Sequence, residues 1–234
     1  MSGIIYGIGV GPGDPELLTM KAVRLLKSAD LVAYPAPEEG DSFARQIAAP
    51  YMNGHQREFA IRMKIGDGQY PKDEIYAEAA DALAAEAQAG KTVAVLCEGD
   101  PFFYGSFMYL YARLVDRVKV EVVPGVSSLM ACAVASGGAL AAKNDVLTII
   151  PAPLPEAELK RRLAEVEAAA IIKIGRHFAK VHKVLREVGL EANARYVERA
   201  TLDNQKVMKL SEVKGDDIPY FSMLLVHRRG DAWS

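Results

Sequence analysis

The amino-acid sequence predicts an α/β protein built from two domains. Three observations support this prediction. The 234 residues, 50% of them hydrophobic, suffice for one large domain or two small ones. Apolar runs alternate with amphipathic stretches in the first half, which indicates a mainly parallel sheet covered by helices. In the second half strand-like runs follow one another, which indicates a mixed sheet. We therefore expect an N-terminal α/β domain over residues 1–123 and a C-terminal α/β domain over residues 124–234.

The expected elements follow from apolar periodicity and from helix start signals. In the first half the expected strands are 3–8, 30–34, 58–61, 92–97 and 119–123, and the expected helices are 15–28, 42–48, 73–89 and 103–115. In the second half the expected helices are 127–135, 156–167 and 178–188, and the expected strands are 146–150, 169–174, 194–200, 205–210 and 222–228. The alanine-rich helix 73–89 is interpreted as scaffold.

Composition narrows the function classes. A net charge of −2 gives no reason to expect nucleic acid as the main partner. Cys97 and Cys132 match neither a disulfide nor a zinc spacing, which is typical of a reducing cytoplasm. His177 and His182 lie outside the spacing of two metal ligands on one helical face. With no apolar run of membrane-spanning length and no signal-peptide pattern, we expect a soluble cytoplasmic protein without a metal site.

The most distinctive motif is the loop after the first expected strand, where glycines occupy alternate positions from 7 to 13. Glycine leaves bare backbone that another group can approach closely. Asp14 is a suitable N-cap residue and Pro15 a suitable first helical residue. The dinucleotide fingerprint G-x-G-x-x-G fails in both registers, because Pro12 or Asp14 stands where its third glycine belongs. An NAD-dependent oxidoreductase is therefore disfavoured, and we expect a different ligand at this loop.

A second motif, VLCEGDPFFYGS over residues 95–106, continues an apolar run. Glu98 and Asp100 therefore lie at the carboxyl end of a buried strand, where open α/β sheets bind their ligands. Asp100 followed by Pro101 is also an N-cap sequence, so capping alone is the alternative. A cap requires neither a second carboxylate nor the aromatic residues 102–104, and we favour ligand contact.

A third motif, VVPGVSS over residues 122–128, places Ser127 and Ser128 at the start of an expected helix. One hydroxyl is expected to cap that helix, which leaves the other for a ligand. The small residues that follow, Cys132 among them, are interpreted as packing residues.

Together the strings GVGPGDPELLTMKA, LCEGDPFFYG and VVPGVSS resemble the tetrapyrrole methylases, the class III S-adenosylmethionine (SAM)-dependent enzymes of cobalamin and siroheme synthesis. The resemblance runs in matching order from residue 3 to about residue 210. YPAP at 34–37, FFYGSF at 102–107 and KIGRHF at 173–178 are similar to the precorrin-2 C(20)-methyltransferase branch. The resemblance implies a homodimer, an active-site cleft between two α/β domains, and methylation of carbon 20 of precorrin-2 to give precorrin-3A and S-adenosylhomocysteine.

Carried onto this sequence, the resemblance implies a SAM site. Its expected residues are Pro12, Glu98, Gly99, Asp100, Phe103, Ser127, Ser128, Ile174, Ala200 and Thr201. Of these, the four residues from Glu98 to Phe103 would hold the methionine and ribose portions of SAM. Ser127 and Ser128 would contact its carboxylate end. Ile174, Ala200 and Thr201 would border the adenine. Many relatives have glycine in place of Glu98 and of Ala200, so at these two positions the chain departs from the family pattern.

Substrate recognition is expected to involve cations, because precorrin-2 carries many carboxylates. The segment 43–64 contains the basic residues Arg45, His55, Arg57, Arg62 and Lys64 against a single acid, Glu58, and a solvated surface is the alternative. Arg176 and His177 directly follow an expected strand, and Tyr34 ends another, with a structural turn as its alternative. We expect Tyr34, Arg45, Arg176 and His177 to bind substrate. His182 and His227 are expected to be structural.

The chemistry requires few catalytic side chains. Conjugation makes carbon 20 nucleophilic, the sulfonium is already a strong methyl donor, and alignment in a dry site can supply on the order of 7–11 kcal/mol. Water or a substrate carboxylate would serve as the base, and no catalytic residue is identified. The alternatives are a cobalt-loaded substrate of the anaerobic route (cobalt-factor II), methylation at another tetrapyrrole position, and a non-catalytic SAM-binding regulator, which the basic segment argues against.

Overall fold

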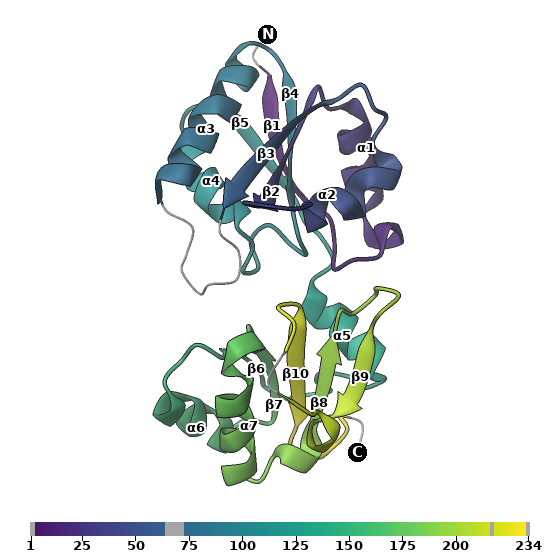
Figure 1. Cartoon of the computed structure of the whole chain (residues 1–234), viewed down its shortest axis with the longest axis vertical. Coiled ribbons are helices and arrows are strands. Elements are labelled where there is room, and N and C mark those ends of the chain that lie inside the picture. The colour runs from purple at the N-terminus through teal and green to yellow at the C-terminus, as the bar shows by residue number, and fades with distance from the viewer. Residues whose placement is uncertain (1–2, 64–72, 216–217, 233–234) are drawn as a thin grey trace. The chain divides into compact units, whose positions relative to one another are not determined.

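The computed structural model describes residues 3–63, 73–215 and 218–232 of the chain. The chain folds into two compact units, Met1–Ser127 and Ser128–Ser234, each built on its own five-stranded sheet (Figure 1). Among the described residues, no helix is both long enough and apolar enough to span a membrane.

The sheet of the N-terminal unit is parallel throughout, as expected, with the strand order β3-β2-β4-β1-β5. Its strands are β1 (Ile4–Gly9), β2 (Leu31–Pro37), β3 (Arg57–Met63), β4 (Thr92–Cys97) and β5 (Lys119–Val123). All five expected strands are confirmed, and β4 and β5 have the predicted bounds. Because β1 pairs with both β4 and β5 in parallel, the carboxyl ends of these three strands lie at the same edge.

Helices cover both faces of this sheet (Figure 1). They are η1 (Pro15–Leu17), α1 (Met20–Ser28), α2 (Phe43–Ala48), η2 (Ala49–Tyr51), α3 (Asp73–Gln88) and α4 (Phe107–Leu114). α3 and α4 bury Leu83 and Leu110 against one face, and α1 and α2 bury Leu26 and Ile47 against the other. The sheet is therefore apolar on both sides, and its polar groups gather at the strand ends.

Two helices differ from the sequence prediction. The helix expected over 15–28 is divided into η1 and α1, because Thr19 is extended and its hydroxyl caps α1 by accepting a hydrogen bond from Ala22 N at 3.1 Å. The helix expected over 103–115 begins only at Phe107, after a turn that Asp100 caps.

The C-terminal unit contains the expected mixed sheet, with the strand order β6-β7-β10-β8-β9. Its strands are β6 (Leu147–Pro151), β7 (Ala168–Ile172), β8 (Ala194–Glu198), β9 (Lys206–Lys209) and β10 (Ser222–His227). Its helices are α5 (Ser128–Ser136), α6 (Glu156–Ala164), η3 (Gly175–His177), α7 (Phe178–Glu187), η4 (Glu191–Asn193) and η5 (Leu210–Glu212). β7 and β8 are both antiparallel to β10, so they run in the same direction and end at the same edge.

The two faces of this second sheet are covered by different helices. α6 and α7 bury Leu163 and Val184 against one face. α5 contacts β8 and β10 on the other face, where Arg195 Nη1 donates a hydrogen bond to the carbonyl of Ser136 at 3.3 Å. The sequence predicted every helix and strand of this unit except the short 3-10 turns, with bounds that differ by up to three residues.

Candidate functional site

Three glycine-containing loops meet at the carboxyl ends of β1, β4 and β5. The backbones of Gly11 and Gly99 exchange two hydrogen bonds, at 3.2 and 2.8 Å. A Cβ atom added to Gly9 would lie 2.6 Å from Gly125 N and 2.7 Å from Gly99 O, and one added to Gly125 would be closer still to Gly99 O. The close approach that the first motif predicts is therefore made, in part, by the backbones of the other two motifs.

Asp100 holds two of these loops together. Its Oδ1 accepts hydrogen bonds from Phe102 N at 2.9 Å and from Phe103 N at 3.1 Å, which is a helix-cap arrangement. Its Oδ2 accepts a hydrogen bond from Gly125 N at 3.0 Å. The capping role weighed in the sequence analysis is thus present, and the second oxygen adds a tie to the loop after β5.

Glu98 directly follows β4, and the backbone N–H groups that favour its ionised form are its own and that of Ala44, in the first turn of α2. Burial raises the pKa of Glu98, and the two N–H groups offset part of that rise. Burial likewise raises the pKa of the preceding thiol, Cys97, to about 11. Both groups therefore lie in a desolvated environment at the end of β4.

The aromatic residues after Asp100 lie in edge-to-face pairs. Phe103 packs on Tyr104 with ring centroids 5.1 Å apart, and Phe102 packs on Tyr111 at 5.0 Å. Phe102 and Tyr104 remain about half exposed, at 50% and 48%. Two large aromatic side chains are thus presented to solvent beside the strand end where ligand contact is expected.

In the C-terminal unit, the three residues expected at the adenine lie just beyond β7 and β8. Ile174 follows β7 and is fully buried, whereas Ala200 and Thr201 follow β8. Because β7 and β8 end at the same edge, the fold brings these segments to one side of the sheet. Ser127 and Ser128 lie at the junction of the two units, where Ser128 is the first residue of α5.

Backbone strain marks the same strand ends. Five described residues other than glycine have positive φ angles: Tyr104, Lys143, Lys173, Arg199 and Thr201. All but Lys143 lie within seven residues of the carboxyl end of β4, β7 or β8. Such conformations are costly for residues with a Cβ and concentrate at functional sites. The strain is therefore an observation, independent of the motifs, that points to these edges.

Two of the expected substrate residues form a triad with Glu58. Arg45 donates from Nε and Nη2 to the two oxygens of Glu58 at 2.8 and 2.9 Å, and Tyr34 Oη donates to Oε2 at 2.6 Å. These bonds lower the pKa of Glu58 to about 2, with Arg45 as the larger cause, and burial together with Glu58 raises the pKa of Tyr34. The structure thus joins Tyr34 to Arg45, a pairing that the sequence analysis did not foresee.

The other substrate candidates and the rest of the basic segment are dispersed. Arg176 and His177 lie in η3, where burial, Lys180 and Arg176 lower the pKa of His177. Arg57 forms an ion pair with Glu86, and Arg62 Nη1 donates to the carbonyl of Pro37 at 2.9 Å. His55 is exposed, and Lys64 lies outside the described residues. The basic residues of 43–64 that the structure describes therefore do not form one cluster.

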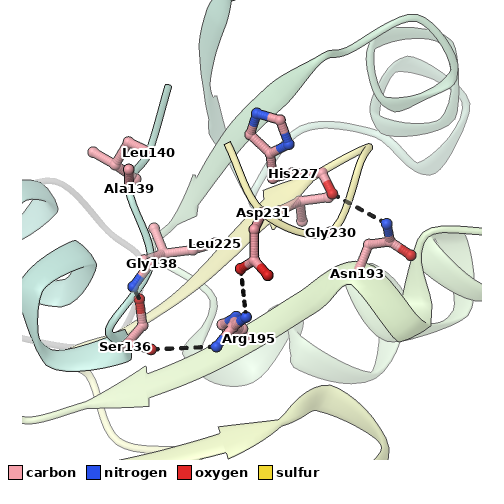
Figure 2. Close-up of a pocket in the computed structure, with 11 residues that line it drawn as sticks. Ser136, Gly138, Ala139, Leu140, Asn193, Arg195, Leu225, His227, Gly230 and Asp231 are labelled. Atoms are coloured by element: carbon pink, nitrogen blue, oxygen red, sulfur yellow. Dashed lines mark hydrogen bonds and ion pairs between the residues drawn. The ribbon is translucent and has the colours of Figure 1, made fainter. Parts of the chain in front are cut away.

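A separate small pocket lies beside α5 in the C-terminal unit (Figure 2). Arg195 lies between the Ser136 carbonyl and Asp231, to which Nη2 donates at 2.8 Å, and Asn193 Nδ2 donates to the carbonyl of His227 at 3.1 Å (Figure 2). The free space is about 20 Å³, which is room for about one water molecule. None of the residues predicted for SAM or substrate lines it.

The two histidines expected to be structural have acidic partners. His182 Nε2 lies 2.6 Å from Glu191 Oε1. His227 Nε2 lies 3.1 Å from Asp145 Oδ2, and Asp145 also accepts two hydrogen bonds from the guanidinium of Arg229. Within the described part of the chain, no group of three or more His, Cys, Asp or Glu residues is arranged to hold a metal ion.

Some residues of these sites were missed by sequence reasoning. Gly125 was assigned only to a turn, because its contact with Gly9 and Gly99 joins segments far apart in the chain. Glu58 carried a usable signal as the single acid of a basic segment. Gln205, whose side chain bonds the backbone of Thr201, carried none.

The chain is similar to known proteins in family, in sequence and in structure. Residues 4–214 match the family described as Tetrapyrrole (Corrin/Porphyrin) Methylases. The chain is 42% identical to a precorrin-2 C(20)-methyltransferase of Sinorhizobium sp over 97% of both chains. It is 32% identical to the cobalt-precorrin-2 C(20)-methyltransferase of Salmonella typhimurium strain LT2 over 98% of both chains.

The chain is also similar to a longer protein and to two solved structures. The cobalamin biosynthesis protein CobIJ of Mycobacterium tuberculosis is 40% identical over 96% of this chain, but the chain spans only about half, 46%, of its length. A cobalt precorrin-4 methyltransferase, CbiF, superimposes with a TM-score of 0.76 at 26% identity, over 97% of this chain and 96% of that chain. A uroporphyrin-III C-methyltransferase from Thermus thermophilus, complexed with S-adenosylhomocysteine, gives a TM-score of 0.70 at 26% identity over 96% and 92% of the two chains.

Proposed function

We propose that the chain, which belongs to the tetrapyrrole (corrin/porphyrin) methylases, is a SAM-dependent C-methyltransferase of cobalamin biosynthesis. Its reaction would methylate carbon 20 of precorrin-2 and release precorrin-3A and S-adenosylhomocysteine. The observation that carries this proposal is the 42% identity over 97% of both chains to a protein of that name. We place the protein in the cytoplasm and expect a homodimer, as the resemblance implies.

The strand ends suit a cofactor with both charged and flat parts. In the N-terminal unit the loops after β1, β4 and β5 offer bare backbone, a fixed carboxylate and exposed aromatic rings. We assign Glu98, Gly99, Asp100 and Phe103 to the methionine and ribose portions, and Pro12 to the lining of the cofactor site. Asp100 contributes by holding Gly125 against Gly99, so that the loops keep one arrangement. SAM supplies the methyl group, and the residues of the chain bind and orient it.

The remaining assignments follow the same reasoning. Ser127 and Ser128 are assigned to the carboxylate end of SAM. Ile174, Ala200 and Thr201, at the shared edge of β7 and β8, are assigned to the adenine.

Substrate carboxylates require cations at fixed positions. Arg45 is held by Glu58 through two hydrogen bonds, and bidentate pairing leaves its Nη1 group for another acceptor. Tyr34 shares the same glutamate. We assign Tyr34 and Arg45, and in the C-terminal unit Arg176 and His177, to the carboxylates of the macrocycle. Burial, Lys180 and Arg176 lower the pKa of His177, so this residue would act as a neutral hydrogen-bond partner at neutral pH.

A second candidate substrate is the cobalt-loaded tetrapyrrole. The observation in its favour is the 32% identity over 98% of both chains to a cobalt-precorrin-2 C(20)-methyltransferase. Residues of the chain do not distinguish the two substrates, because cobalt would be bound by the macrocycle.

The test is incubation of the purified protein with SAM and either precorrin-2 or its cobalt complex. We expect a mass gain of one methyl group on one of the two pigments, placed on carbon 20 by NMR. Reactions without SAM are the control. A methyl group at another carbon would contradict the branch assignment, and no gain on either substrate would refute the enzymatic proposal.

A further inference from the structure

The turn after β8 is strained in a way that local sequence does not explain. Arg199 has a φ of 50° and Thr201 a φ of 71°, although neither is glycine. Two left-handed residues within three positions persist only when neighbouring groups hold them. The turn contains Ala200 and Thr201, two of the residues that we assign to the adenine of SAM.

One set of contacts holds the turn at its start, through a buried carboxylate. The side chain of Glu198 is 5% exposed, accepts a hydrogen bond from Arg199 Nη1 at 2.8 Å and forms an ion pair with Lys206 Nζ at 2.9 Å. Tyr196 Oη donates to the same carboxylate at 2.5 Å and lies 3.1 Å from Ser222 Oγ. Together these cations and the hydroxyl lower the pKa of Glu198, against the effect of burial.

A second contact holds the turn at its other end. The side-chain oxygen of Gln205 accepts a hydrogen bond from Thr201 N at 2.7 Å. Leu202 N donates to the carbonyl of Arg199 at 3.0 Å, and Gln205 N donates to the carbonyl of Leu202 at 2.9 Å. The segment 199–205 is thus closed on itself, and Arg199 N donates to Phe221 O at 2.8 Å, which ties it to the residue before β10.

Such a brace is poorly explained by stability alone. A buried ion pair contributes little net stability, because desolvation offsets its attraction. Gln205 is exposed, and no packing requires its side chain there. Both groups act instead on the geometry of Ala200 and Thr201.

We infer that Glu198 and Gln205 are positioning residues, which hold the 199–201 turn in the strained conformation that presents Ala200 and Thr201 to the adenine of SAM. This inference rests on the proposed function. Neither residue touches the reacting atoms, and both act through the backbone of the turn.

The test uses Gln205→Ala and Gln205→Glu in the full chain, with S-adenosylhomocysteine binding measured by calorimetry. The alanine variant loses the acceptor for Thr201 N, and we expect its affinity to fall by up to about tenfold, the effect of one hydrogen bond. The glutamate variant keeps an acceptor oxygen and should bind within about twofold of wild type. Asn204→Ala, at the exposed neighbouring position, is the matched control and should bind as wild type.

A second ligand separates positioning from general damage. S-inosylhomocysteine has a carbonyl in place of the amino group of the adenine and carries a proton on N1, so the ratio of the two affinities reports contact with this edge of the base. We expect wild type to prefer the adenosyl compound and Gln205→Ala to narrow this preference. Wild type binding neither compound would contradict the proposed function itself. The inference alone would be overturned if wild type bound both compounds equally, or if Gln205→Ala kept its affinity or lost it equally for both ligands. A Gln205→Glu variant that bound S-adenosylhomocysteine as weakly as the alanine variant would also overturn it.

Discussion

Removal of the Asp100 carboxylate tests whether the N-terminal loops are held as a unit. Asp100→Ala deletes the acceptor of three backbone N–H groups, at Phe102, Phe103 and Gly125. Loss of a helix cap costs about 0.5–2 kcal/mol. Loss of one hydrogen bond to a charged group costs about 1.5–3 kcal/mol, so the unfolding free energy should fall by about 2–5 kcal/mol in total.

Two comparison variants divide this cost. Asp100→Asn keeps an oxygen for the cap but replaces the other by an N–H₂ group that cannot accept from Gly125 N, so it should lose only the share of that bond, about 1.5–3 kcal/mol. Asp14 occupies the other Gly-Asp-Pro sequence and accepts from Glu16 N at 2.8 Å, so Asp14→Ala should show the loss of a cap, about 0.5–2 kcal/mol.

The assays are urea denaturation followed by far-UV circular dichroism and calorimetric binding of S-adenosylhomocysteine. Both Asp100 variants should bind this ligand more weakly than wild type, whereas Asp14→Ala should bind as wild type. If the unfolding free energy of Asp100→Ala were no lower than that of Asp14→Ala, the hydrogen bond from Gly125 N to Asp100 would not contribute to stability. If both Asp100 variants bound the ligand as wild type does, Asp100 would be only a cap.

Three further predictions concern packing and charge. Gly125→Ala should lower both the unfolding free energy and the affinity for S-adenosylhomocysteine, because its Cβ would collide with Gly99 O. Gly138→Ala is the control: its Cβ would lie 3.6 Å from the nearest atom, so this variant should behave as wild type in the same denaturation and binding assays. The pKa of the Glu58 carboxyl is lowered to about 2, so the stability that its ionised form adds is complete above its ordinary pKa of about 4.5 and is lost as pH falls toward 2. The difference in unfolding free energy between wild type and Glu58→Gln, measured by urea titration, should therefore be full at pH 7 and shrink below pH 4.5. A difference that does not depend on pH would contradict the Tyr34–Glu58–Arg45 triad. Asp145→Ala should destabilise the C-terminal unit, because it leaves the buried His227 and the Arg229 guanidinium without their carboxylate. A thermal midpoint equal to that of wild type would contradict this expectation.

The fold was predictable where local chemistry decides it. β4 and β5 were assigned to the residue because the apolar run of β4 lies between the charged residues Lys91 and Glu98, and β5 ends at the breaker Pro124-Gly125. The helix over 15–28 was wrong at its start, because Pro15 and Thr19 are both good start signals and only the packing of the chain decides that the second begins the longer helix.

The sites were predictable only in part. Asp100 was selected correctly as a strand-end carboxylate, but its bond to Gly125 joins residues that no local pattern relates. The glycines of the first motif were interpreted as space for a ligand, and two of them make room for protein atoms instead: a Cβ on Gly7 would collide with the Phe107 ring, and one on Gly9 with Gly125. Long-range contacts of this kind depend on the folded sheet, which places the ends of β1, β4 and β5 together.

We propose that this chain transfers a methyl group from SAM to carbon 20 of a precorrin-2 macrocycle. The most direct measurement is mass spectrometry of the pigment after reaction with SAM carrying an isotopically labelled methyl group, followed by NMR location of the label. We expect one labelled methyl group per macrocycle, on carbon 20. Recovery of both precorrin-2 and its cobalt complex without label would contradict it.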